Sequence, residues 1–215
     1  GGRRVVLVHP ADNLRAEAAA SLLKSMEEPP EGLIWVLTAE KLDDVLPTIR
    51  SRSRLVRVPM PDHEAALAFL KSKKLKKPEE ALAMAGGSPL AAREPSADER
   101  LSAKTENAVL EFLRAGPELS VDALVRLYAP DLTLPAFSLL VSRWAHDLMR
   151  SALGLQPRFF IDENAAIERL ASHTDAKRAA GFCTQALSCR RAAAHTLNPK
   201  QTVESVLLRY KQIFQ

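Results

Sequence analysis

The stretch AAASLLKSMEEPPEGLIWVLTAEKLDDVLPTIRSRSR, residues 18–54, decides how the first part of this chain folds. It opens in a helical pattern that Pro29 and Pro30 end, because the residue before a proline is pushed out of the α region. The apolar run LIWVL, residues 33–37, has the length and composition of a buried strand. Three arginines close the stretch: Arg50, Arg52 and Arg54. The residues therefore predict a helix, a strand and a basic segment, in that order.

A second apolar run precedes this stretch. Residues 5–8, VVLV, are rich in β-branched side chains and are typical of a strand that is buried on both faces. Asp12 or Asn13 is placed to cap the helix that follows. Strand, helix and strand then form a βαβ unit, and we expect a short helix at residues 43–46 and a third strand at residues 55–58.

Three strands are fewer than a doubly wound domain usually has. The chain also enters a core strand directly, with no earlier element to flank it. Both observations favour the C-terminal part of a longer protein, and a small α+β protein is the alternative.

Helices alone are predicted beyond the prolines at positions 59 and 61. Asp62 can cap the first of three short helices, a lysine-rich segment at residues 71–77 follows it, and Ser88 can cap the third. A polar linker then leads to six further helices, with no repeat period that would indicate a solenoid. The expected helices lie at residues 103–115, 121–128, 134–153, 164–174, 176–195 and 200–213.

Composition sets broad limits on the function. Of 215 residues, 47% are hydrophobic and 26% charged, which suits a globular protein with a packed core. The net charge of +4 permits contact with phosphate groups without requiring it. Cys183 and Cys189 are six positions apart on a predicted helix, on opposite sides, so we expect free thiols in a reducing compartment. No run is long enough to span a membrane, and no export leader is evident.

The residues needed for ATP hydrolysis are missing. The sequence contains no GxxxxGK[ST] loop, whose backbone N–H groups surround phosphates. ATP hydrolysis also requires an acidic pair after the first strand, which holds Mg²⁺ and a water. His9 and Pro10 follow that strand here, and a proline cannot bind a metal ion. Asp12 is interpreted as a helix cap and not as a metal ligand. No HExxH motif and no Ser-His-Asp or Cys-His arrangement suggests another kind of catalysis.

Two motifs in the opening stretch, LLKSMEEPP and TIRSRS, resemble those of the AAA+ clamp-loader family. The C-terminal segment HTLNPKQTVESVLLRY also resembles the closing helix of that family's collar domain. The resemblance implies an α/β fold that is the rear part of an AAA+ (P-loop-like) domain, followed by mostly α structure. It divides the chain into the AAA+ core part at residues 1–61, a three-helix lid at residues 62–94 and a helical collar for oligomerisation at residues 95–215.

The resemblance also assigns roles to residues of the basic segment. In the family, an arginine in a Ser-Arg-Cys motif acts on the ATP of the neighbouring subunit, and Arg52 between Ser51 and Ser53 matches it. Ser53 replaces the cysteine of the motif. The alternative is that the arginines only form a solvated basic edge. Thr38 matches a polar sensor at the end of a core strand, with capping of the next turn as its alternative.

Other positions are expected to contact DNA or to have lost a function. Lys24 and the lysines Lys73 and Lys74 are candidate phosphate contacts, because helices of this region surround DNA in the assembled family. The alternative is a solvated face on which Lys24 pairs with Glu28. The lid sequence at residues 87–90 lacks the arginine that serves as a second sensor in the family.

The resemblance therefore implies a clamp-loader subunit that hydrolyses no ATP and binds no cofactor, with ATP and Mg²⁺ on neighbouring subunits. It implies as partners other loader subunits (gamma/tau and delta), the sliding clamp indirectly and primer–template DNA, but no membrane. We expect it in the bacterial cytoplasm, at the nucleoid-associated replisome. The alternatives are a truncated ATP-hydrolysing motor of the gamma/tau type and a DNA-binding helical scaffold.

Overall fold

The computed structural model describes residues 2–95, 100–118, 132–193 and 198–215. Its internal contacts divide the chain into two compact units, an N-terminal unit, Gly1–Pro59, and a C-terminal unit, Met60–Gln215. The division falls close to the predicted end of the core part at residue 61. No helix among the described residues is both long and apolar enough to cross a membrane.

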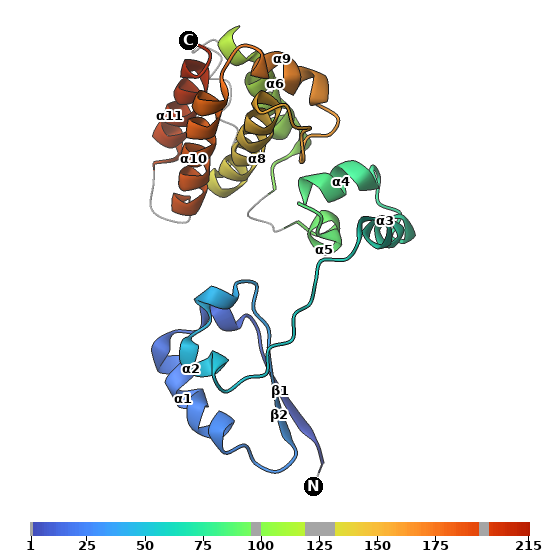
Figure 1. Ribbon diagram of the computed structural model, residues 1–215, viewed down its shortest axis with the longest axis vertical. Helices are drawn as coiled ribbons and strands as arrows, with labels where there is room; N and C mark the ends of the chain where they lie inside the picture. Colours follow the sequence, from blue (N-terminus) through green and yellow to red (C-terminus); the bar gives the residue numbers. More distant parts are fainter. Residues whose placement is uncertain (1, 96–99, 119–131, 194–197) are drawn as a thin grey trace. The chain divides into compact units, whose positions relative to one another are not determined.

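The N-terminal unit contains the predicted βαβ unit (Figure 1). Strand β1, Arg4–Val8, leads through a 3-10 turn at Ala11–Asn13 into helix α1, Ala16–Glu27. Strand β2, Leu33–Leu37, lies parallel to β1 in a register that pairs Arg4 with Leu33 and Val8 with Leu37. Helix α1 ends just before the two prolines, as their backbone restriction predicts.

The prediction that the strands are buried on both faces is wrong. Side chains alternate along each strand, and those on one face are exposed: Val5 and Leu7 at 62% and 63%, Ile34 and Val36 at 48% and 41%. The opposite face lies under helix α1 and the helices after β2 (Figure 1). A run of apolar residues thus predicts a strand. Whether one or both faces of that strand are buried depends on which helices or strands pack against it.

Two further local predictions for this unit also fail. Residues 55–58 form no strand; Leu55, Val56 and Val58 are 55%, 73% and 89% exposed, and within the described chain the sheet consists of β1 and β2 alone. β-branched composition favours an extended backbone, but a strand also needs a partner edge. In place of one short helix at residues 43–46, a 3-10 turn at Leu42–Asp44 and helix α2, Pro47–Arg50, flank an extended Val45.

The C-terminal unit begins with the three predicted short helices: α3, His63–Ser72; α4, Pro78–Met84; and α5, Pro89–Arg93. Both predicted caps form, since the Asp62 side chain accepts from the Ala65 N–H and the Ser88 side chain from the Ala91 N–H. The helices share a small core of their own, made of Ala66, Leu70, Leu82 and Ala92.

A larger helical bundle follows, with its own core (Figure 1). Helices α8 and α10 pack along one another, and the helix predicted at residues 121–128 lies outside the described residues. The described helices otherwise lie close to the predicted ranges. They are α6, Ala103–Ala115; α8, Leu134–Ala152; α9, Asn164–Ala171; α10, Ala176–Ala192; and α11, Pro199–Gln212, with a 3-10 turn at Gly116–Glu118 after α6.

Two aromatic side chains in the centre of this bundle have their polar groups paired. The fully buried Trp144 donates its ring N–H to the Tyr210 hydroxyl over 3.0 Å, and Tyr210 donates in turn to the Leu113 carbonyl over 2.6 Å. Burial raises the pKa of Tyr210 far above its ordinary range, so the phenol stays a donor. Cys183 and Cys189 are free thiols, as the sequence predicts.

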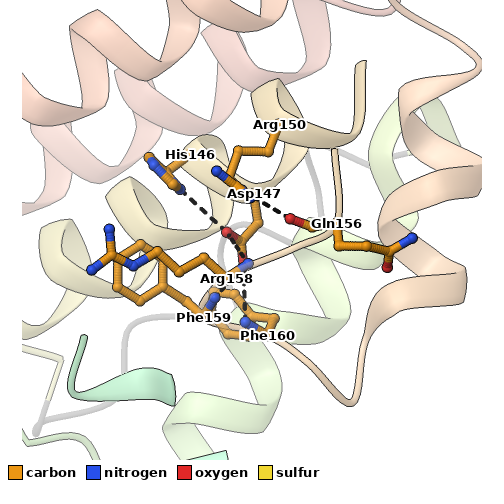
Figure 2. Close-up of polar contacts among 7 residues, drawn as sticks. All are labelled: His146, Asp147, Arg150, Gln156, Arg158, Phe159 and Phe160. Carbon is orange, nitrogen blue, oxygen red and sulfur yellow. Dashed lines mark hydrogen bonds and ion pairs between the residues drawn. The ribbon is translucent and has the colours of Figure 1, made fainter. Parts of the chain in front are cut away.

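A buried carboxylate holds the loop between α8 and α9 (Figure 2). Asp147 on α8 is fully buried, and its two oxygens accept the backbone N–H groups of Arg158, Phe159 and Phe160 over 2.8–2.9 Å. The Arg158 guanidinium donates to the Gly86 carbonyl at the end of α4, at 3.4 Å. One buried acid therefore shapes the loop from which Arg158 contacts the three short helices.

Gly116, which ends α6, cannot carry a side chain without damage. Its backbone has φ +53° and ψ −115°, and an added Cβ lies 2.2 Å from a methyl group of the fully buried Leu170. We expect Gly116→Ala to lower the free energy of unfolding by about 2–4 kcal/mol, from backbone strain and overpacking together. Urea unfolding followed by circular dichroism measures the loss.

Gly154→Ala is the matched control for the crowding at Gly116. Gly154 also has a positive φ, +77°, but no atom lies within 4 Å of an added Cβ. We therefore expect Gly154→Ala to lower the free energy of unfolding by about 1 kcal/mol, from backbone strain alone. Equal losses in the two variants contradict the role of Leu170.

Candidate functional site

Arg52 lies in the turn after α2 and is held by several contacts within the N-terminal unit. Its Nε donates to Glu27 Oε1 over 2.5 Å, and its Nη2 forms an ion pair with the same oxygen. Its Nη1 donates to the Thr48 carbonyl at 3.1 Å and to the Ser51 hydroxyl at 3.2 Å. The side chain is still 36% exposed, so the guanidinium is oriented yet reachable from solvent.

Packing of helix α2 against α1 creates this arrangement. Ile49, 1% exposed, joins Ala19 and Val45 in the small core of the unit, and Leu23 and Met26 of α1 pack against that core. Leu23 and Met26 belong to the last turns of α1, so Glu27 arrives beside the turn that follows α2. The apolar residues of the LLKSMEEPP motif thus bring its acidic end to the arginine.

The rest of the basic segment is also structured. The Ser53 hydroxyl donates to the Ile49 carbonyl over 2.8 Å, and the Ser51 hydroxyl donates to the Thr48 carbonyl over 3.1 Å. Arg50 lies 3.8 Å from the exposed carboxylate of Asp43. Both serines therefore reinforce the turn that presents Arg52, and serine at position 53 is compatible with that turn.

Thr38, the residue expected to act as a sensor, contacts the position where an acidic pair is missing. Its Oγ1 forms a 2.6 Å hydrogen bond with His9 Nδ1, and its backbone N–H donates to the Val8 carbonyl. The hydroxyl is therefore engaged across the ends of the two parallel strands and not with the turn that follows it. No group of His, Cys, Asp or Glu in the described chain is arranged to hold a metal ion.

The interpretation of Asp12 as a helix cap is wrong. Helix α1 begins at Ala16, with Arg15 at its N-cap and no side chain bonded there. Asp12 Oδ2 instead accepts the backbone N–H groups of Glu40 and Lys41, at 3.3 and 3.2 Å. The 3-10 turn moves the helix start away from Asp12, which supports the loop after β2.

The candidate lysines divide between the two units. Lys24 lies exposed on α1, and its predicted pairing with Glu28 does not form in the described chain, where the acid that finds a partner is Glu27. Lys73 ends α3 with its ammonium 5.6 Å from the centre of the Phe69 ring, and Lys74 has a left-handed backbone with φ +56°. Within the N-terminal unit, no described contact joins Lys24 to Arg52.

Sequence reasoning missed Glu27 as a partner of Arg52. The two residues are 25 positions apart, and no helical or strand periodicity relates them. The available signal was chemical, since two acids end the α1 helix in a segment followed by three arginines. That signal does not say which acid meets which arginine.

Comparison with known proteins finds similarity to subunits of DNA polymerase III. Residues 1–62 match the family described as DNA polymerase III, delta subunit. Over 97 residues the chain is 41% identical to DNA polymerase III subunit delta' of Pseudomonas aeruginosa, which covers 43% of this chain and 30% of that protein. The Haemophilus influenzae protein of the same name is 40% identical over 96 residues, 43% of this chain and 29% of that protein. These matches thus span less than a third of the relatives' length.

A solved structure resembles the chain more distantly. A DNA polymerase III gamma subunit-related protein from Thermotoga maritima aligns with 99% of this chain and 73% of its own, at 23% identity and a TM-score of 0.45. At that score the likeness does not establish a shared arrangement of domains.

Proposed function

We propose that this chain is the non-hydrolysing delta-prime subunit of the DNA polymerase III clamp loader, a proposal supported by its family match and by its similarity to DNA polymerase III delta' subunits. In this role it supplies Arg52 to the ATP site of a neighbouring subunit and helps to load the sliding clamp on primed DNA. The observation that carries the proposal is an exposed, oriented guanidinium in a unit whose strand β1 is followed by His9 and Pro10.

The chemistry of Arg52 suits a role in trans. Its planar fork matches phosphate oxygens, and an arginine brought to a γ-phosphate stabilises the charge that develops during hydrolysis. Hydrolysis in cis needs, besides the phosphate-binding loop, carboxylates that hold Mg²⁺ and its waters. At the end of β1 an imidazole bonded to Thr38 stands in that place, so ATP and Mg²⁺ belong to the neighbours.

The remaining parts of the proposal concern partners. The three short helices at residues 62–94 act as a lid, and the helices at residues 95–215 act as the collar that joins this subunit to gamma/tau and delta. Lys24, Lys73 and Lys74 are the proposed contacts to the phosphates of primer–template DNA. The assembly meets the sliding clamp and works in the cytoplasm, at the replisome.

Reconstitution tests the proposed function. The full-length protein alone is expected to hydrolyse no measurable ATP. Together with gamma/tau, delta, clamp and primed DNA it is expected to give stimulated hydrolysis and clamp loading, and omitting it removes both. ATP hydrolysis by the full-length protein alone at the rate of the assembly contradicts the proposal.

A further inference from the structure

We propose that Glu27 holds Arg52 in a resting position in the unassembled subunit and releases it when the guanidinium engages the phosphates of a neighbour. This inference rests on the proposed function, because it concerns the same arginine. Glu27 then competes with the phosphates for Arg52. Its carboxylate therefore raises the KM of the assembled site for ATP.

The geometry points to competition. Nε and Nη2 form the edge of a guanidinium that recognises two oxygens at once, and both face Glu27 Oε1. The Nη1 group is bonded to the Thr48 carbonyl and the Ser51 hydroxyl. A phosphate that takes the two-pronged edge of Arg52 must therefore displace the carboxylate.

Charge leads to the same conclusion. A carboxylate at hydrogen-bond distance cancels most of the electric field that the guanidinium produces at a nearby phosphate. It also adds a negative charge that repels the triphosphate. An arginine that stabilises a developing negative charge works best without such a neighbour. Leaving Glu27 in place weakens Arg52 in that task.

Exposure makes the exchange possible. The side chain of Arg52 is 36% exposed and that of Glu27 is 47% exposed. Ion pairs of this kind are weak, because water solvates both groups once they separate. A Mg²⁺-bound triphosphate carries a larger charge than one carboxylate, so it can replace Glu27, whereas a fully buried pair cannot open at similar cost.

Glu28 provides the matched control for Glu27. It is the next residue, has the same charge and lies exposed just past the end of α1. Within the described residues its side chain has no cationic partner. Glu28→Gln changes the net charge in the same way as Glu27→Gln without touching Arg52.

The first experiment observes the pair itself. Nitrogen-15 NMR of arginine side chains in the isolated full-length subunit is expected to show slow hydrogen exchange at Arg52 Nε. Glu27→Gln is expected to accelerate this exchange at least several-fold, and Glu28→Gln to leave it unchanged. Equal exchange in Glu27→Gln and the unaltered protein overturns the resting pair.

The second experiment measures its effect in the assembled loader. Glu27→Gln is expected to lower the KM for ATP roughly two- to five-fold, the range for an exposed ion pair, with kcat unchanged. Glu28→Gln is expected to match the unaltered loader, and Glu27→Gln is expected to have no effect when Arg52→Ala is also present. A higher KM or a lower kcat in Glu27→Gln overturns the proposal, because either result means that Glu27 helps Arg52 to act.

The outcomes separate the two proposals. If Arg52→Ala leaves hydrolysis unchanged, the role of Arg52 in trans is wrong, and the inference about Glu27 fails with it. If Arg52→Ala reduces hydrolysis while Glu27→Gln leaves KM unchanged, only the competition by Glu27 is wrong.

Discussion

Arg52→Ala is expected to remove nearly all hydrolysis at the neighbouring ATP site that we propose this chain completes, a loss of roughly a thousand-fold in kcat at that site. The physical reason is the charge that builds up on the γ-phosphate oxygens in the transition state, which the guanidinium stabilises at short range. The measurement is DNA-stimulated ATP hydrolysis by the reconstituted loader, which is expected to fall by the share that this site contributes.

Two companion variants make the result specific to Arg52. Arg54→Ala removes the same charge two positions further on, where the described chain has no acidic partner, and is expected to keep the full rate. Arg52→Lys keeps the charge but loses the planar fork, so it is expected to restore little of the activity. Full activity in Arg52→Ala, or an equal loss in Arg54→Ala, contradicts a specific role for this arginine.

Asp147→Ala is expected to give the largest loss of stability of any single change considered for the C-terminal unit, about 3–5 kcal/mol. Its carboxylate is fully buried and accepts three successive backbone N–H groups, of Arg158, Phe159 and Phe160 (Figure 2). Alanine leaves these donors without acceptors and releases the backbone of Phe160, whose ring packs edge-on against Trp144. Urea unfolding followed by circular dichroism measures the difference.

Asp162→Ala is the control for this effect. Asp162 lies in the same connection between α8 and α9 and is also an aspartate, but it is exposed. Its removal is expected to change the free energy of unfolding by no more than about 0.5 kcal/mol. Similar losses in both variants indicate that the connection tolerates no change at all, and they contradict a special role for the buried carboxylate.

Much of the secondary structure could be predicted because its causes are local. Asp62 and Ser88 cap helices within three residues, and Pro29 ends α1 by restricting the residue before it. The apolar run of β2 is long enough to specify a strand wherever a partner strand exists. Residues 55–58 have a similar composition without a partner, so the same pattern produced a wrong prediction there.

The candidate site was only partly predictable for the same reason. The position of Arg52 and the loss of an acidic pair at His9 and Pro10 are properties of residue types in order. The bond between Thr38 and His9 joins the ends of two strands, and Asp12 serves a loop 28 residues away. Neither contact can be read from periodicity, because each depends on how β1 and β2 pair.

The sequence by itself determined most of the helices, the two strands and their order, and it contained the motifs on either side of Arg52. Only the tertiary structure decided that the strands have one exposed face, that Asp147 holds the loop after its own helix and that Glu27 meets Arg52. The physical reason is the distance along the chain over which each interaction acts. Caps and backbone restrictions act over a few residues, whereas the partner of a side chain is chosen by the packing of whole elements, here α1 against α2.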